Sequence, residues 1–496
     1  MKTSLKIIKM VSVSCMVLFG MFLTACDGGG GTTVPTYTVG GTVSGLSGTL
    51  VLQNNGGDDL TIASNGAFTF ATPLANSASY DVTILTSPIN QNCTCTNGTG
   101  IICEANVSDV EVTCVNKGWT HPFDLTDNIS PDAEDASVPK VAMDRNGNAI
   151  ITWLESDGSN DQIFMSEYRS GSWTHPLDLA DNISPDGQDA SDPEVAMDDN
   201  GNAIIAWYQS DGSNEQIFMS EYRSGTWSHP LDLADNISPN GQHAYNPQVA
   251  MDNNGNAIIT WEQSDGSNVQ IFKSEYRSGG WTHPANLADN ISPNGQNARY
   301  PEVAMDNNGN AIIAWYQSDG SNKQIFMSEY RSGGWAYPAD LADNISPDGE
   351  HVSDPQVAMD DNGNAIITWA QSDGSNWQIF KSEYRSGGWS HPASLADNIS
   401  PDGQDAYIVC SPQVAMDDNG NAIITWEQWN GSNWQIFKSE YRNGTWTHPA
   451  GLADNISPDG QIAYYPSVAM GNNGNAIITW AQSDGINEQI FISEYR

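Results

Sequence analysis

The sequence predicts an all-β protein, and three observations support this fold class. From Gly118 onward the chain consists of near-identical repeats, each marked by one tryptophan. The steps between these tryptophans are 54 residues, apart from one step of 57. Each repeat holds four β-type runs separated by Asn-Gly, Ser-Asp-Gly or Ser-Gly turns. Such repeats are typical of β-propellers, so we expect a seven-bladed β-propeller over residues 118–496. The marker tryptophans are Trp119, Trp173, Trp227, Trp281, Trp335, Trp389 and Trp446.

The second repeat illustrates the four expected strands. They cover residues 194–198, 202–207 and 216–223, and the fourth begins at Trp227. Paired isoleucines such as Ile204 and Ile205 break the alternation of a strand with one solvated face. This pattern favours a blade that is buried on both faces by its neighbours.

The ends of the repeat region predict a closed ring rather than a linear solenoid. Residues 118–123 match a fourth strand, whereas Arg496 ends a third strand. We therefore expect residues 118–123 to complete the last blade. This arrangement would remove both exposed sheet edges, and the repeats show none of the polar caps that a solenoid requires.

The N-terminus has the features of a signal peptide over residues 1–25. Three lysines precede an apolar run from Met10 to Leu23, which is short for a membrane span. The string Leu23-Thr24-Ala25-Cys26 then resembles the lipobox of bacterial lipoproteins. The resemblance implies acylation of Cys26, membrane contact through this lipid anchor alone, and a Gly-rich linker over 26–36. An ordinary signal peptide followed by a chance cysteine is the alternative.

The resemblance to bacterial lipoproteins implies a location in the bacterial cell envelope. Asp27 follows the acylated position, where aspartate resembles a retention signal for the inner membrane. The periplasmic side of the inner membrane and the outer membrane or cell surface both stay open as locations.

Residues 37–117 are expected to form a small antiparallel β-sandwich. Strand candidates at 49–53, 67–70 and 80–85 alternate with turn signals. The stretch resembles the Ig-like modules that separate anchor and payload in bacterial lipoproteins, which implies a spacer.

Four cysteines of this domain are expected to form two disulfides, because an exported chain meets an oxidising compartment. Of three pairings, we favour Cys93–Cys114 between two strands and Cys95–Cys103 across a turn. A metal site is the rival interpretation, but the segment has no histidine and no Cys-x-x-Cys spacing.

The formal net charge of −42 limits the classes of partner. It repels the phosphates of nucleic acids and anionic lipids. Cations, cationic partners and neutral glycans remain. We expect a monomer that binds a glycan or a protein of the envelope or surface.

The repeats differ from one another mainly on one face, here called the variable face. It carries the turns after the second strands and the loops after the fourth strands. Three tryptophans outside the repeat pattern fall on this face, as does a three-residue insertion. Exposed aromatic residues stack on sugars or anchor proteins, so we assign ligand binding to Trp377, Trp429, Trp434 and Tyr407.

No metal and no cofactor is predicted. Residues 144–148 resemble part of a calcium loop, but no acidic residue follows at the required spacing, and Gly471 replaces the first aspartate in the last repeat. A plain hairpin turn is the favoured interpretation, with calcium as the alternative. The recurring histidines, such as His175 and His229, are expected to be structural.

A binding protein is favoured over an enzyme. A catalytic site needs unlike residues at one point, whereas repeats supply the same residue many times and suit multivalent binding. The Ser-x-Asp-x-Gly-x-x-Trp box of sialidases does not occur, and no catalytic residues are assigned. A glycan-cleaving glycosidase or lyase and a scaffold in an envelope complex are the alternatives.

Overall fold

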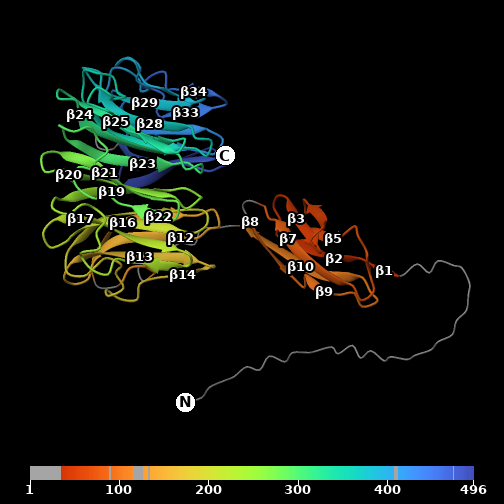
Figure 1. Cartoon of the computed structure of the whole chain (residues 1–496). Helices are drawn as coiled ribbons and strands as arrows, with labels where there is room; N and C mark the ends of the chain where they lie inside the picture. Colours follow the sequence, from red (N-terminus) through yellow and green to blue (C-terminus); the bar gives the residue numbers. More distant parts are fainter. Residues whose placement is uncertain are drawn as a thin grey trace, which may run out of the picture. The chain divides into compact units, whose positions relative to one another are not determined.

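The computed structural model (Figure 1) describes residues 35–88, 91–116, 127–131, 134–406, 412–472 and 474–495. Every regular element in these ranges is a β-strand, which confirms the all-β class. No helix within them is long and apolar enough to span a bilayer. The chain divides into two compact units, Met1–Asp127 and Asn128–Arg496. The predicted signal peptide, Cys26 and the predicted domain boundary at 117/118 fall outside the described residues.

The N-terminal unit contains two four-stranded sheets and a two-stranded ribbon. The first sheet has the order β5 (Gly66–Thr69), β2 (Val39–Ser44), β10 (Val107–Asn116), β8 (Gln91–Thr96). The second has the order β4 (Asp58–Ile62), β3 (Leu50–Asn54), β7 (Ser79–Thr86), β9 (Thr99–Ile101). The ribbon pairs β1 (Thr36–Tyr37) with β6 (Leu74–Ala75).

One hydrophobic core joins the two sheets. It contains Val39 and Val110 from the first sheet and Leu50 and Leu52 from the second. The expected strands at 49–53, 67–70 and 80–85 correspond to β3, β5 and β7. The purely antiparallel arrangement was wrong, because β10 pairs with β2 in parallel. A parallel pair needs a long crossover, and here the chain passes through the second sheet between the two strands.

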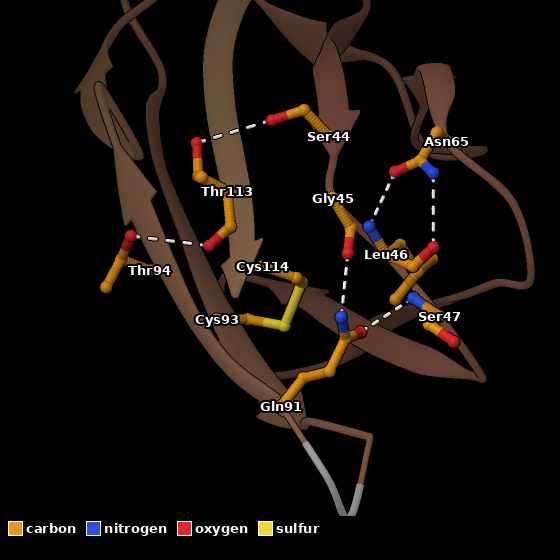
Figure 2. The surroundings of a disulfide bond; sticks show 10 residues. All are labelled: Ser44, Gly45, Leu46, Ser47, Asn65, Gln91, Cys93, Thr94, Thr113 and Cys114. Carbon is orange, nitrogen blue, oxygen red and sulfur yellow. Dashed lines mark hydrogen bonds between the residues drawn. A yellow bond between two sulfur atoms is a disulfide. The ribbon is translucent and has the colours of Figure 1, made fainter. Parts of the chain in front are cut away.

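Only one of the two expected disulfides forms in the described residues. Cys93 on β8 and Cys114 on β10 lie directly opposite each other and are bonded (Figure 2). The predicted Cys95–Cys103 bond was wrong, because both cysteines are free. Cys95 points between the sheets, with Sγ 3.5 Å from the carbonyl oxygen of Val82. Cys103 follows β9 on the other sheet and is exposed, so the two thiols belong to different sheets.

Within the described residues, the C-terminal unit contains six four-stranded antiparallel sheets followed by a three-stranded one (Figure 1). The first strands are β11 (Ala136–Met143), β15 (Ala190–Met197), β19 (Ala244–Met251), β23 (Ala298–Met305), β27 (Val352–Met359), β31 (Gln413–Met416) and β35 (Ala463–Met470). The second strands are β12 (Ala149–Ser156), β16 (Ala203–Ser210), β20 (Ala257–Ser264), β24 (Ala311–Ser318), β28 (Ala365–Ser372), β32 (Ala422–Trp429) and β36 (Ala476–Ser483).

The outer strands complete these sheets. The third strands are β13 (Asp161–Arg169), β17 (Glu215–Arg223), β21 (Val269–Arg277), β25 (Lys323–Arg331), β29 (Trp377–Arg385), β33 (Trp434–Arg442) and β37 (Glu488–Tyr495). The fourth strands are β14 (Ser172–Thr174), β18 (Thr226–Ser228), β22 (Gly280–Thr282), β26 (Gly334–Ala336), β30 (Gly388–Ser390) and β34 (Thr445–Thr447).

The first strands are longer than the sequence pattern suggested. β15 starts at Ala190, and its register with β16 shifts between Ser191 and Glu194. The bulged residue Asp192 has a φ of +50°, and Pro193 follows it without an N–H group. A bulge breaks the alternation that identifies a strand, which is why the first residues were not assigned to it.

Successive sheets pack on one another through apolar junctions. Between the second and third sheets, Ile204 and Ile217 meet Ile259, Trp261 and Phe272. Ile205, the neighbour of Ile204, belongs instead to the junction between the first and second sheets. The expectation that each repeat is buried on both faces is therefore confirmed for these sheets.

The outer strands carry a repeated polar ladder. Arg169 pairs with Glu167, as the corresponding residues do in the next five sheets. The Arg169 guanidinium also lies 3.8 Å from the ring centroid of Tyr222 in the following sheet. His175 exchanges a 2.8 Å hydrogen bond with Ser166 and stacks on Trp173, in line with a structural role.

The first and last sheets each expose an apolar face. Ile490 is 76 % exposed and Ile477 is 42 % exposed, whereas their counterparts in the other sheets are buried. On the first sheet, Val141 and Met143 are each 65 % exposed. The predicted closing strand 118–123 and Arg496 lie outside the described residues.

Candidate functional site

The variable face contains four equivalent clefts. Each is formed by the turn between the second and third strands of one sheet and by the loops before and after that sheet. Their volumes are about 920, 650, 790 and 760 Å³ from the first sheet to the fourth. Pockets of about 300–1,000 Å³ accommodate small organic ligands.

The lining of the clefts repeats with the sequence. In the cleft of the second sheet, Asp211 and Ser213 come from the turn, and Leu233, Ala234 and Asn236 come from the following loop. The same five residue types line the other three clefts. A sugar ring offers both apolar C–H surface and hydroxyl groups. The combination of leucine and alanine with carboxylate, hydroxyl and amide groups matches both features.

Local hydrogen bonds preform each cleft. Asp211 Oδ1 accepts hydrogen bonds from the backbone N–H groups of Ser213 and Asn214, at 2.7 and 2.8 Å. In the loop, Asp235 Oδ2 accepts the N–H of Leu231 at 2.7 Å, and Asp232 Oδ1 accepts the N–H of Ala234 at 2.8 Å. Because aspartate favours such turns, the repeated Ser-Asp-Gly and Ala-Asp-Asn strings fix the cleft walls.

The three tryptophans assigned to ligand binding lie on the variable face of the fifth and sixth sheets. Trp429 and Trp434 face each other across the turn between β32 and β33, with ring centroids 5.9 Å apart. Trp377 occupies the position in the fifth sheet that Trp434 occupies in the sixth, and it packs partly against the core of that junction. All three are partly exposed.

Asp405 connects the tryptophans of the fifth and sixth sheets through hydrogen bonds. Asp405 Oδ1 accepts the N–H of Trp377, and its backbone oxygen accepts the N–H of Trp429, both at 2.9 Å. The chain then continues into the three-residue insertion. Tyr407, the fourth residue assigned to ligand binding, and Cys410 lie outside the described residues.

The residue after the second-strand tryptophan differs between repeats, and in two repeats it is a glutamate that supports the next sheet. Glu262 and Glu427 are only 3 % and 1 % exposed. Glu262 accepts the backbone N–H of Tyr300 at 3.0 Å, and Glu427 accepts that of Tyr465 at 2.6 Å. These side chains thus support the bulge of the next sheet.

A second hollow lies where the first strands converge. It has a volume of about 220 Å³ and is lined by residues of the first four sheets. We call it the axial cavity. Its lining residues are Val138, Lys140, Asp192, Glu194, Asn246, Pro247, Gln248, Tyr300, Pro301 and Glu302. They occupy the third to fifth positions of their eight-residue strands, around the middle of each strand.

The bulges bring these side chains to the axis. Val138, Asp192, Asn246 and Tyr300 all have φ values between +50° and +54°. This left-handed conformation is tolerated by aspartate and asparagine but costly for valine and tyrosine. The residue two positions later then lines the cavity in each strand.

The axial cavity holds an ion pair and a second carboxyl group. Lys140 Nζ lies 2.5 Å from Glu194 Oε1, and Gln356 Nε2 donates to Glu302 Oε1 at 3.0 Å. Burial raises the pKa of Glu194 despite Lys140. Burial and the nearby Glu194 carboxylate raise the pKa of Glu302 to about 8.

Sequence reasoning missed the axial residues, although a signal was present. Each repeat has a proline and a valine separated by one residue. That residue differs where the repeats are otherwise near-identical: it is Lys140, Glu194, Gln248, Glu302, Gln356, Gln413 and Ser467. The repeats therefore do bring unlike residues to one place, contrary to the argument from their similarity.

Among the described residues, no group of three or more His, Cys, Asp or Glu side chains is arranged to hold a metal ion. In the loops that resemble part of a calcium site, the aspartate oxygens serve the turn itself. Asp198 Oδ1 accepts the N–H groups of Asn200 and Asn202, and Oδ2 accepts the Asn202 side chain at 2.6 Å.

Comparison with known proteins finds similarity in structure alone. No family model and no curated protein sequence matches the chain. An ulvan lyase described as a new polysaccharide lyase family shares 12 % identity over 73 % of this chain and 94 % of its own, with a TM-score of 0.45. The fucose-specific lectin from Aleuria aurantia shares 14 % identity over 65 % and 97 %, with a TM-score of 0.33. Neither likeness is high enough to assign a function.

Proposed function

We propose that this protein is a lipid-anchored glycan-binding protein of the bacterial cell envelope. Acylated Cys26 is its anchor, the Ig-like N-terminal unit is a spacer, and a seven-bladed propeller binds glycans through the variable face. The observation that carries the proposal is the set of four equivalent clefts with the same lining. Equivalent sites on one rigid body bind repeating polymers with increased avidity.

The clefts can be tested by filling them. Four exposed alanines line them and contribute only backbone N–H groups to the loops, so longer side chains there leave the sheets intact. They are Ala180, Ala234, Ala288 and Ala342. We expect the quadruple Ala→Gln variant of soluble 27–496 to lose about tenfold or more of its apparent affinity for the glycan selected on an array.

The matched control is Ala336→Gln, which changes an exposed alanine on β26 away from the clefts. Unchanged binding by the quadruple variant would exclude the clefts. Absence of any glycan ligand for the unmodified protein would contradict the proposed function as a whole. Shortened glycan chains in the same samples would favour a glycan-cleaving enzyme.

The tryptophan sector requires its own variant. Trp429→Ala combined with Trp434→Ala removes the paired rings on the sixth sheet. If these rings stack on sugar, each should contribute roughly 1 kcal/mol, and the double variant should bind about thirtyfold more weakly in calorimetry. Equal binding would limit the tryptophans to packing.

A further inference from the structure

The axial cavity differs from the clefts in size, chemistry and symmetry. At about 220 Å³ it is smaller than pockets for drug-sized ligands, so it suits one small group of a larger molecule. The clefts repeat, whereas the axial cavity occurs where Lys140, Glu194 and Glu302 each come from a different sheet. The side chain of Lys140 is 41 % exposed, so the cavity opens to solvent.

The charges of the cavity favour a cation. Three carboxyl groups line it, those of Asp192, Glu194 and Glu302, against the single ammonium group of Lys140. Lys140 is committed to Glu194 at 2.5 Å. Glu302 has an amide donor in Gln356 but forms no ion pair within the described part of the chain.

The chain itself shows that the cavity accommodates an ammonium group. Lys140 Nζ already sits against one of its carboxylates, and its side chain is 41 % exposed, so it enters from the solvent side. A second ammonium group placed at Glu302 would contact a carboxyl group, as Lys140 Nζ contacts that of Glu194. Tyr300 and Asn246 add an aromatic ring and an amide to the wall. Both groups assist the recognition of cations and of hydroxyl groups.

We propose that the axial cavity binds the primary ammonium group of an unacetylated amino sugar. This inference rests on the proposed glycan-binding function and adds a substrate class to it. Because the pKa of Glu302 is raised to about 8, its carboxyl group would release its proton to solvent when it pairs with the ligand ammonium group. It would keep the hydrogen bond from Gln356, and Lys140 would limit the affinity as a tethered competitor.

The test compares glucosamine oligomers with their N-acetylated counterparts by titration calorimetry on soluble 27–496. Glu302→Gln should weaken binding of the glucosamine oligomer about tenfold and leave the acetylated oligomer unaffected. Lys140→Gln should strengthen binding of the glucosamine oligomer by roughly threefold, because the competing cation is gone. If Glu302 and Lys140 have a purely structural role, each variant should bind the glucosamine oligomer and the N-acetylated oligomer more weakly.

The matched control is Gln413→Glu, which adds a carboxylate at the equivalent position of the sixth sheet, outside the lining of the cavity. Equal affinity for both oligomers, or equal losses in the Glu302 variant, would overturn the axial proposal while the clefts stand. Binding of neither oligomer, together with no other glycan ligand, would instead remove the proposed function itself.

Discussion

At the scale of single residues, Glu262 and Glu427 occupy equivalent positions but differ in whether an arginine pairs with the buried carboxylate. Glu262 and Glu427 both accept a backbone N–H from the next sheet. Glu262 is also 3.0 Å from Arg299 Nη1, whereas the position of Arg299 is Tyr464 in the last sheet. Glu427 Oε2 is buried without a partner, and burial raises the pKa of Glu427 to about 7.

This difference predicts a pH-dependent stability. Since the pKa of Glu427 is higher in the folded state than the usual 4.3 of an unfolded chain, folding favours its protonated form. Stability should fall as pH rises from about 4.3 to about 7. Glu427→Gln mimics the protonated group, so it should raise the free energy of unfolding by roughly 3 kcal/mol at pH 8 and by little at pH 4.

Denaturant unfolding across this pH range measures the effect. Glu111→Gln, at an exposed position on β10, controls for the loss of one negative charge. A constant difference between the Glu427 variant and the unmodified protein at all pH values would contradict the assigned protonation.

At the scale of elements, the first hairpin of each sheet depends on its leading aspartate. Asp198 accepts three hydrogen bonds within the turn and is 1 % exposed. The last sheet has Gly471 at this position, which lacks the carboxylate, and backbone hydrogen bonds of Gly471 close the turn. The repeats thus contain a natural substitution at the same site.

Two reciprocal substitutions test this element. Asp198→Gly should lower the free energy of unfolding by about 1.5–3 kcal/mol, because hydrogen bonds to a charged acceptor are lost. Gly471→Asp should raise it by about 1 kcal/mol and slow hydrogen exchange in β35 and β36. Loss of stability in the Gly471→Asp variant would show that an aspartate at this position does not stabilise the last hairpin as Asp198 stabilises the second sheet's hairpin.

At the scale of the whole molecule, the question is what joins the first sheet to the last. Arg145 of the first sheet lies 3.2 Å from Asp361 and 2.9 Å from Asp418, so the series of sheets curves back on itself. Its side chain is 52 % exposed, and such ion pairs contribute at most about 1 kcal/mol each. Burial of the exposed faces around Ile490 and Val141 would stabilise the molecule more than these ion pairs, since apolar burial contributes roughly 25 cal/mol per Å².

Closure by residues 118–123 predicts a specific role for Trp119. In the second sheet, Trp227 on the fourth strand packs on Tyr222 with ring centroids 5.5 Å apart. Trp119 would pack in the same way on Tyr495, which is 52 % exposed. Trp119→Ser should therefore destabilise the protein as much as Trp227→Ser, by about 3 kcal/mol in thermal or denaturant unfolding. No effect in the Trp119 variant would contradict closure by this segment.

Local regularities allowed much of the fold to be predicted. Tryptophan spacing, Asn-Gly turns and isoleucine pairs each depend on neighbours in sequence. They located β17 and the start of β16 to within about a residue, whereas β16 continues beyond the predicted end at Trp207 to Ser210. The bulged starts of the first strands escaped, because Pro193 and a positive φ at Asp192 remove the alternation. The predicted disulfide between Cys95 and Cys103 was wrong for a related reason, since closeness in sequence does not place two residues on one sheet.

The all-β class, the repeated four-stranded unit and the face on which the repeats differ can all be predicted from the amino-acid sequence. These properties follow from periodicity and turn chemistry, which act over a few residues. The meeting of Lys140, Glu194 and Glu302 is a property of the tertiary structure, because they are separated by 54 and 108 residues in the sequence. Their meeting depends on the curvature of the whole series of sheets. That curvature is set by the packing of each sheet on the next, which a local pattern does not encode.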